Sequence, residues 1–297
     1  MKKETTSILL AGLATLCWAT VASAFKLTLK YIRHDVLSMV FFASAFSTMV
    51  FLFILIVRKH SFQIKKTRII HSALLGLINP AIYYIVLFKA YDLLPGQQAQ
   101  PLNYTWPIML TLLSVLFLGQ TVHLKDLAGI FISFFGVILI SLQGNFQIPS
   151  DFNLPGLVLA LGSSILWATF WILNMRDSRS AVEKLFWNFL FGTIVLAMVI
   201  SISGRFVVPS LQAWAGIAWI GLFEMGITFI LWMKALDLCR NPVRIANIVY
   251  LSPFISLFFL NRIIGESISW ASLSGLLFIV LGILIKAQFV KIPGKDA

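Results

Sequence analysis

The feature that most constrains this chain is a succession of long apolar runs that fill nearly all of its 297 residues. An α-helix needs about 20 apolar residues to cross about 30 Å of hydrocarbon. Backbone groups in lipid must be hydrogen-bonded within the chain, and runs without strict polar–apolar alternation favour helices over barrel strands. Composition agrees, since 59% of the residues are hydrophobic and 11% are charged, against about 25% charged in soluble domains. The sequence predicts an all-α integral membrane protein and excludes a soluble enzyme.

Ten of these runs are predicted to be transmembrane helices. They cover Ile8–Leu29, Val36–Val57, His71–Tyr91, Gly96–Leu118, Leu127–Leu142, Leu154–Asn174, Leu185–Ser203, Leu211–Leu236, Val243–Asn261 and Ile268–Ala287. The connections between them are short. Ten such helices leave no room for a folded soluble domain.

The distribution of basic residues predicts the orientation of the helices. Seventeen of the 23 Lys and Arg residues fall on the same side as the N-terminus, and six fall on the other side. Because basic loops stay in the cytoplasm, both termini are expected there, in a multi-pass protein of a bacterial inner membrane. The excess of basic residues in cytoplasmic loops accounts for the net charge of +12. No nucleic-acid partner is therefore expected.

The two halves of the sequence are similar to each other. Gly76–Asp92 aligns with Gly221–Asp237 at an offset of 145, Tyr104–Pro107 with Tyr250–Pro253 at 146, and Trp18 with Trp167 at 149. We therefore divide the chain into two five-helix repeats, residues 1–146 and 147–297. Lys2, Lys3 and the Ala22-Ser23-Ala24 run resemble a signal peptide, but the repeat requires Trp18, so the first segment is interpreted as a retained helix.

Five helices are an odd number, so the second repeat enters the membrane from the opposite side. Inverted repeats are the architecture of many secondary transporters, with the substrate site near the midplane between the halves. Gly129 and Gly136 align with Gly275 and Gly282. Their spacing of seven puts each pair on one helix face, where small residues allow close helix packing.

These features together resemble a known family. The run Pro253, Gly265-Glu266, Gly275 and Gly282, in a chain of ten helices and two halves, resembles EamA-type members of the drug/metabolite transporter superfamily. The resemblance implies a transporter of small organic solutes, often an exporter of amino acids or other metabolites. It also implies a central cavity formed by the first, third, fourth, sixth, eighth and ninth helices. The first half departs from the pattern of the second, because Gln120 stands where the second half has Glu266. This difference argues against a functional site that both halves share at this position.

Glu224 is the clearest candidate for the site, because an ionisable side chain deep in a membrane is costly and tends to be functional. Its repeat partner is Asn79. Spacing of four puts Asn79 and Tyr83 on one helix face, and Glu224, Thr228 and Trp232 on another. We expect these faces to line the cavity, with Glu224 binding a substrate amine or carrying a proton. The alternative is that Glu224 is a structural hydrogen-bonding residue.

Paired aromatic and amide residues extend this candidate site. They are Trp18, Trp167 and Trp171 in the first and sixth helices, and Asn103, Tyr104, Asn247 and Tyr250 in the fourth and ninth. Pro107 and Pro253 follow the two tyrosines and are expected to kink their helices. Aromatic rings and amides suit a small zwitterionic or cationic molecule. Aromatic packing between helices is the alternative interpretation.

Two charged pairs at helix ends are candidate gates. Lys89 and Asp92, and Lys234 and Asp237, are each three residues apart and fall on opposite sides of the membrane. They are candidates for the charges that open and close the two access routes. The alternative, a snorkelling lysine with a local ion pair, is also consistent with these positions.

The function predicted is secondary transport, because no nucleotide-hydrolysis motif is present. We expect export of small polar organic metabolites such as amino acids by alternating access, by a functional monomer in the lipid bilayer that needs neither cofactor nor metal. The alternatives are uptake of a metabolite, or export of an organic cation or drug. A membrane-embedded lipid enzyme and a receptor are further alternatives, disfavoured by the absence of a clustered acid–histidine site and of a soluble output domain.

Overall fold

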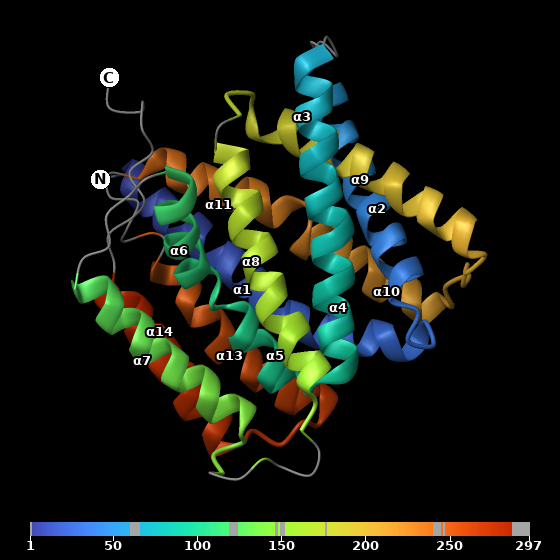
Figure 1. The fold of residues 1–297 in the computed structure, drawn as a ribbon. Helices are drawn as coiled ribbons and strands as arrows, with labels where there is room; N and C mark the ends of the chain where they lie inside the picture. The colour runs from blue at the N-terminus through green and yellow to red at the C-terminus, as the bar shows by residue number, and fades with distance from the viewer. Residues whose placement is uncertain are drawn as a thin grey trace.

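The regular structure of this chain is helical throughout the described residues, without a strand among them (Figure 1). The computed structural model describes residues 2–59, 66–118, 124–145, 148, 152–175, 177–239, 245 and 247–286. The first half contains α1 (Lys2–Tyr31), α2 (Val36–Val57), α3 (Lys66–Gly76), η1 (Leu77–Ile82), α4 (Tyr83–Leu93), α5 (Gly96–Asn103), α6 (Trp106–Leu118) and α7 (Leu124–Ser141). The second contains α8 (Leu154–Met175), α9 (Ala181–Ser203), α10 (Leu211–Trp219), η2 (Ile220–Glu224), α11 (Ile227–Leu238), η3 (Val249–Leu251), α13 (Ser252–Phe259), η4 (Leu260–Ile264) and α14 (Trp270–Lys286).

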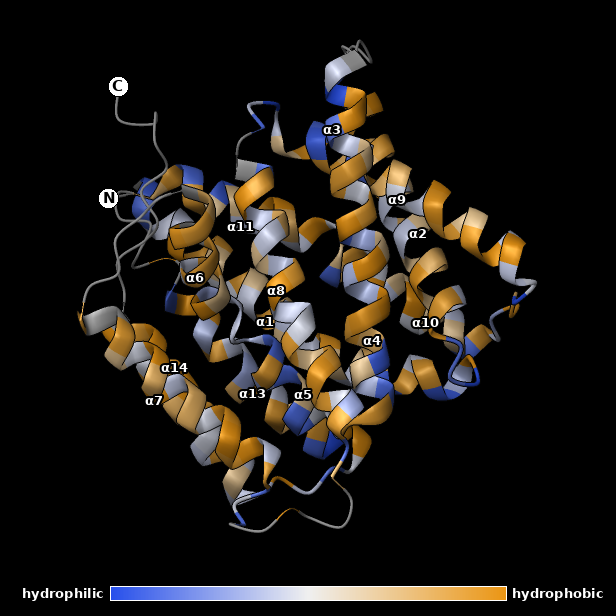
Figure 2. Cartoon of the chain, in the orientation of Figure 1, coloured by the Kyte–Doolittle hydropathy of each residue, from blue (hydrophilic) through white to orange (hydrophobic). Residues whose placement is uncertain are grey.

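The chain is a multi-pass membrane protein. Six helices are long and apolar enough to cross a bilayer, over Lys3–Tyr31, Val36–Val57, Thr67–Leu93, Leu154–Asn174, Ala181–Ser203 and Leu211–Leu238. Shorter apolar helices cover Leu127–Ser141, Val249–Ile264 and Trp270–Ile285. Large hydrophobic side chains such as Phe53, Phe131 and Ile202 are exposed, and Figure 2 shows that apolar residues make up most of the helices. Such surfaces suit contact with lipid.

Side-chain caps set where several of the helices begin. Asp35 accepts a hydrogen bond from Ser38 N at 2.7 Å and caps α2, and Ser210 accepts one from Ala213 N and caps α10. Ser180 caps α9, which begins at Ala181. The predicted start at Leu185 misses this first turn because the turn is polar.

Two of the long helices are broken halfway. In η1 the backbone of Asn79 leaves helical geometry (φ −143°, ψ 116°) just before Pro80. In the second half, η2 ends at Glu224, and Gly226 adopts φ −110° and ψ −105° before α11 starts. The predicted runs His71–Tyr91 and Leu211–Leu236 did not indicate these breaks. Asn79 and Glu224 align at the repeat offset of 145, so the breaks fall at equivalent positions.

The helices that carry the two predicted proline kinks are also interrupted. Residues Tyr104 and Thr105 separate α5 from α6, and Pro107 is the second residue of α6. A 3-10 turn, η3, precedes α13, in which Pro253 occupies the first turn. Proline is tolerated in a first helical turn because its missing N–H has no intrahelical partner there.

Helix packing divides the molecule into several neighbouring groups. Helices α7 and α14 lie side by side along one edge (Figure 1). Helix α1 packs on α11 and α13, helix α8 on α4 and α6, and helix α9 on α2 and α3. A Cβ atom at Gly136 would overlap the carbonyl oxygen of Gly275, and one at Gly282 would overlap that of Gly129. The predicted packing role of these glycines is confirmed, because their backbones touch.

Candidate functional site

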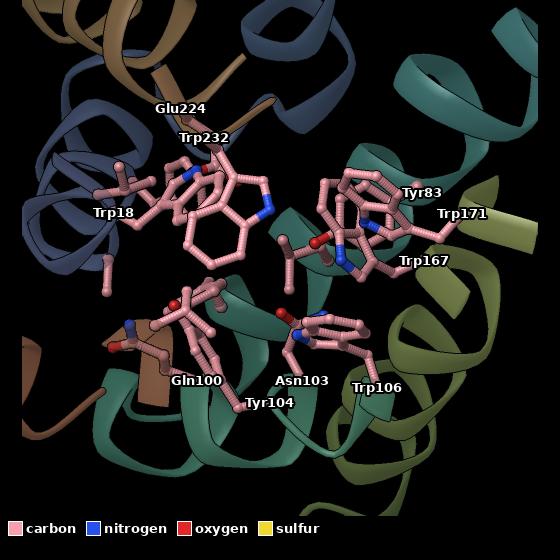
Figure 3. Close-up of a pocket in the computed structure, with 16 residues that line it drawn as sticks. Trp18, Tyr83, Gln100, Asn103, Tyr104, Trp106, Trp167, Trp171, Glu224 and Trp232 are labelled. Carbon is pink, nitrogen blue, oxygen red and sulfur yellow. The ribbon is translucent and has the colours of Figure 1, made fainter. Parts of the chain in front are cut away.

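A cavity opens in the middle of the helix bundle (Figure 3). It encloses about 630 Å³ of space free of protein atoms, with the open solvent at its mouth included. Side chains from α1, α4, α5, α6, α8, η2, α11 and η3 surround it. The lining residues are Trp18, Val21, Ala22, Phe25, Tyr83, Leu87, Tyr91, Gln100, Asn103, Tyr104, Trp106, Trp167, Trp171, Glu224, Trp232 and Val249.

The structure brings most of the sequence-predicted binding residues to this cavity. Those that line it are Trp18, Tyr83, Asn103, Tyr104, Trp167, Trp171 and Glu224, together with Trp232 from the predicted α11 face. Asn79, Thr228, Asn247 and Tyr250 are not among the lining residues. Asn79 and Thr228 are fully buried, and Thr228 donates a hydrogen bond to the carbonyl of Phe223 at 2.5 Å. Tyr250 is buried and Asn247 half-buried.

Glu224 is positioned by the break between η2 and α11. Its side chain is buried, with 8% of the residue surface exposed. Oε1 accepts a hydrogen bond from the hydroxyl of Tyr84 at 3.2 Å. Within the described chain, Glu224 is the one carboxylate of the cavity lining, and the lining includes no Lys, Arg or His.

Aromatic rings form the walls of the cavity. Next to Glu224, Trp18 and Trp232 meet with ring centroids 5.5 Å apart and an interplanar angle of 60°. On the other side, Tyr83 and Trp167 lie 4.8 Å apart at 31°. Figure 3 shows Glu224, Trp18 and Trp232 on one side of the space and Tyr83, Trp167 and Trp171 on the other. The arrangement offers ring faces and edges to a ligand between the two groups.

Helix α5 contributes amide groups to the cavity. Asn103 donates a hydrogen bond from Nδ2 to Ser163 Oγ on α8 at 2.8 Å. Gln100 is buried, and its Oε1 has no hydrogen-bond partner in the described chain. The indole Nε1 of Trp171 also lacks a partner there. These atoms leave one acceptor and one donor for a bound molecule.

Several lining residues were absent from the sequence prediction, namely Val21, Ala22, Phe25, Leu87, Tyr91, Gln100, Trp106 and Val249. Helical spacing from the predicted residues could have found some of them. Ala22 is four residues after Trp18, and Leu87 is four after Tyr83. Phe25 is seven residues after Trp18 and Trp106 is three after Asn103, but an aromatic ring at such a spacing is a weak signal in a chain with 26 Phe and 9 Trp residues.

The two predicted gate pairs differ in the structure. Lys89 Nζ lies 2.5 Å from the carboxylate of Asp92, which also pairs with His34. Lys234 and Asp237 are both exposed, and no ion pair joins these two described residues. Through the contact between Asp92 and His34, the first pair links the end of α4 to the loop after α1. The second pair makes no comparable link among the described residues.

A second polar network lies beside the first pair. The carboxylate of Glu266 accepts hydrogen bonds from the backbone of Gly96 (2.9 Å) and Gln97 (3.1 Å) at the start of α5. Lys26 on α1 lies 3.8 Å from Glu266 and donates to the carbonyl of Leu94. We call this group, Lys26, Glu266 and the Leu94–Gln97 backbone, the α1–α5 latch. Gln120, the repeat partner of Glu266, lies outside the described residues.

Comparison with known proteins places the chain in a family. The model of the EamA-like transporter family matches residues 5–142 and 154–287. The chain belongs to the EamA-like transporter family. A solved crystal structure of another protein has the same fold, with a TM-score of 0.68 at 20% identity, covering 94% of this chain and 97% of the other.

Two of three related proteins are named for transport, and the name of the third states no activity. The uncharacterized transporter YvbV of Bacillus subtilis (strain 168) is 24% identical over 77% of this chain and 74% of its own length. PecM of Dickeya dadantii is 24% identical over 71% of each chain. The aromatic amino acid exporter YddG of Ancylobacter novellus is 24% identical over 59% of this chain, and the match spans 61% of that exporter.

Proposed function

We propose that this EamA-family protein is a secondary transporter that exports small polar organic metabolites by alternating access through the central cavity. The main support for the proposal is the position of the cavity beside the breaks of two long helices. Tyr83 follows the break in η1, Glu224 lies at the break between η2 and α11, and both residues line the cavity. Broken helices around a site at mid-depth are a recurrent feature of secondary transporters. The name of the YddG relative makes amino acids one candidate class of substrate, and amines are the other.

We also propose that the chain forms ten transmembrane helices in two inverted five-helix repeats, residues 1–146 and 147–297. The pattern of helix contacts supports this. Helix α1 packs on α11 as its counterpart α8 packs on α4, and α1 on α13 as α8 on α6. The pairs α3–α9 and α10–α2 correspond in the same way. Such matched interfaces are what a pseudo-two-fold axis between the halves requires.

Single contacts support the same symmetry. At the offset of 149 that relates Trp18 to Trp167, Ser44 corresponds to Thr193, and their hydroxyls lie 2.7 Å apart. Equivalent residues from two halves can touch each other only near the axis that relates them. This contact therefore suggests an axis between α2 and α9.

Alternating access needs closure on each side of the cavity in turn. With both termini in the cytoplasm of a bacterial inner-membrane protein, the α1–α5 latch and the Lys89–Asp92 pair lie on the outer side. The latch joins the halves, because Lys26 and α5 belong to the first and Glu266 to the second. Glu224, the one carboxylate of the cavity lining among the described residues, is the proposed site of proton coupling, since a proton or a cation that neutralises a buried carboxylate lowers the cost of burying it.

The test is solute flux from proteoliposomes loaded with amino acids, polyamines, nucleosides and amines, with and without a pH gradient. We expect selective loss of one class relative to protein-free liposomes, faster with the gradient. Mass spectrometry of the external solution identifies the solute. No loss above the control from liposomes with folded protein, in either direction of loading, would contradict the proposal.

A further inference from the structure

The cavity combines an aromatic enclosure with a single negative charge, and that combination restricts the charge of its ligand. Trp18 and Trp232 meet beside Glu224 (Figure 3), whose carboxylate has one hydrogen bond from Tyr84. A carboxylate in a cavity that indole rings also line attracts a cation through its own charge, and the negative faces of the rings add to that attraction. The partnerless Oε1 of Gln100 adds an acceptor for an N–H group.

The same lining offers little to an anionic group. Among the described residues it contains no Lys, Arg or His, so a substrate carboxylate would find only neutral donors such as Trp171 Nε1. Removing a carboxylate from water without a cationic partner is costly. A zwitterionic amino acid would also place its carboxylate in the same small space as Glu224.

The remaining walls suit an apolar or aromatic body. Tyr83 and Trp167 lie 4.8 Å apart across from the Glu224 side, with Leu87 and Trp106 in the same lining. A molecule with a cation at one end and an aryl ring at the other meets both groups at once.

The geometry points to an arylalkyl ammonium ion, an amine cation without a free carboxylate, as the substrate class of this cavity. The inference rests on the proposed transport function and narrows it. The cation lies against Glu224 on the side of the cavity that Trp18 and Trp232 line, and the ring packs on Tyr83 and Trp167. Glu224 recognises the charge, and the indoles exclude water around it.

Four matched probes separate the contributions of amine and carboxylate. They are 2-phenylethylamine, its N,N,N-trimethyl derivative, phenylalanine and 3-phenylpropionate. Binding to the purified protein is measured by quenching of tryptophan fluorescence, because indoles line the cavity. We expect both cations to bind, phenylalanine at least tenfold more weakly, and 3-phenylpropionate not measurably.

A variant tests the role of Glu224 directly. Glu224→Gln keeps the shape and is expected to weaken binding of both cations at least tenfold. Glu183→Gln in α9, whose side chain lies outside the cavity lining, is the matched control and should bind like the wild type. A thermal unfolding curve for each variant confirms that it is folded. Unchanged cation affinity in folded Glu224→Gln overturns the inference, as does equal or tighter binding of phenylalanine.

Flux separates this inference from the proposed function. Counterflow of the trimethyl derivative, which cannot cross the bilayer as a neutral species, is expected in proteoliposomes with wild-type protein. Transport of amino acids but not of the cation would overturn the substrate class and leave transport standing. Cation binding without movement of any solute would support the site and overturn the transport function.

Discussion

At the scale of single residues, Trp232 and Glu224 have separable roles in the proposed site. A cation over an indole is stabilised by about 0.5–2 kcal/mol, so Trp232→Leu should weaken cation binding about fivefold. Trp232→Phe keeps a ring face and should lose less. Trp270 is 85% exposed, and Trp270→Leu is the matched control. Fluorescence titration of the trimethyl probe measures each affinity, and equal losses for Trp232→Leu and Trp232→Phe would exclude a contribution from the ring.

Asp177 predicts a pH-dependent contribution to stability, outside the membrane-spanning segments. Partial burial raises the pKa of this carboxyl, but the hydrogen bonds from Arg179 and the positive charges of Arg179 and Lys184 together outweigh it, and the pKa is lowered. A carboxylate whose pKa falls on folding stabilises the fold above its ordinary pKa, and the stabilisation is lost as the pH falls through the native pKa. Arg179 also donates to Ser72 on α3 at 2.5 Å, so the ion pair ties the α8–α9 loop to α3.

We expect Asp177→Asn to lower the free energy of unfolding by about 2 kcal/mol at pH 7. The difference from wild type should shrink as the pH falls below about 4. Unfolding temperatures of both proteins across this pH range provide the measurement. Asp237→Asn removes an exposed carboxylate and should have little effect. A gap that is constant with pH would show that the carboxylate's charge is not what stabilises the loop.

At the scale of helices, the α7–α14 interface depends on glycine. A Cβ atom at Gly136 would overlap the backbone oxygen of Gly275, so Gly136→Ala must push the helices apart, at a cost of about 1–3 kcal/mol. A Cβ atom at Gly12 in α1 would have no neighbour within 4 Å among the described residues, and Gly12→Ala should be neutral or stabilise by up to about 1 kcal/mol. Thermal unfolding in the same detergent compares the two. Equal unfolding temperatures would contradict the close contact.

The α1–α5 latch predicts an effect on cavity access. Glu266 accepts two backbone hydrogen bonds at the start of α5 and faces Lys26 at 3.8 Å. Glu266→Gln removes the charge and weakens both links, which should favour the state open on the latch side. Labelling of a cavity cysteine from that side should be about threefold faster or more. A rate unchanged from the parent protein would show that the latch does not control access.

The sequence was sufficient to predict most helices, because in lipid an apolar run of this length has few alternatives. The predicted Val36–Val57 coincides with α2, and Leu154–Asn174 ends one residue before α8 does. The breaks at Asn79 and Gly226 were not predictable in this way. They lie inside continuous apolar runs, and hydropathy does not register Pro80 and Gly226, the residues that weaken the helix at these two points.

The sequence similarity between the two halves was enough to predict much of the candidate site. It did not show which of two aligned residues lines the cavity. It identified Trp18, Trp167 and Glu224, which line the cavity. It also selected Asn79 as the partner of Glu224, yet Asn79 is fully buried within η1, which packs on α9. The helix breaks at or near both of these positions, which align in the sequence, but of the two side chains only Glu224 lines the cavity.

At the scale of the whole molecule, the proposed transport mechanism requires that one cavity opens to the two sides of the membrane in turn. The most direct measurement is labelling of Gln100→Cys, a cavity position on α5, by a membrane-impermeant thiol reagent. The background carries Cys17→Ser and Cys239→Ser, which remove the two native cysteines. Vesicles of each orientation present one side at a time, and Ser201→Cys, exposed on α9, is the control for reagent access.

We expect Gln100→Cys to react from both sides, and bound substrate to shift the two labelling rates in opposite directions. Ser201→Cys should not respond to substrate. Alternating access requires this reciprocity, because a cavity that opens on one side closes on the other. Labelling from one side alone, at a rate that substrate does not change in transport-competent vesicles, would contradict alternating access through this cavity.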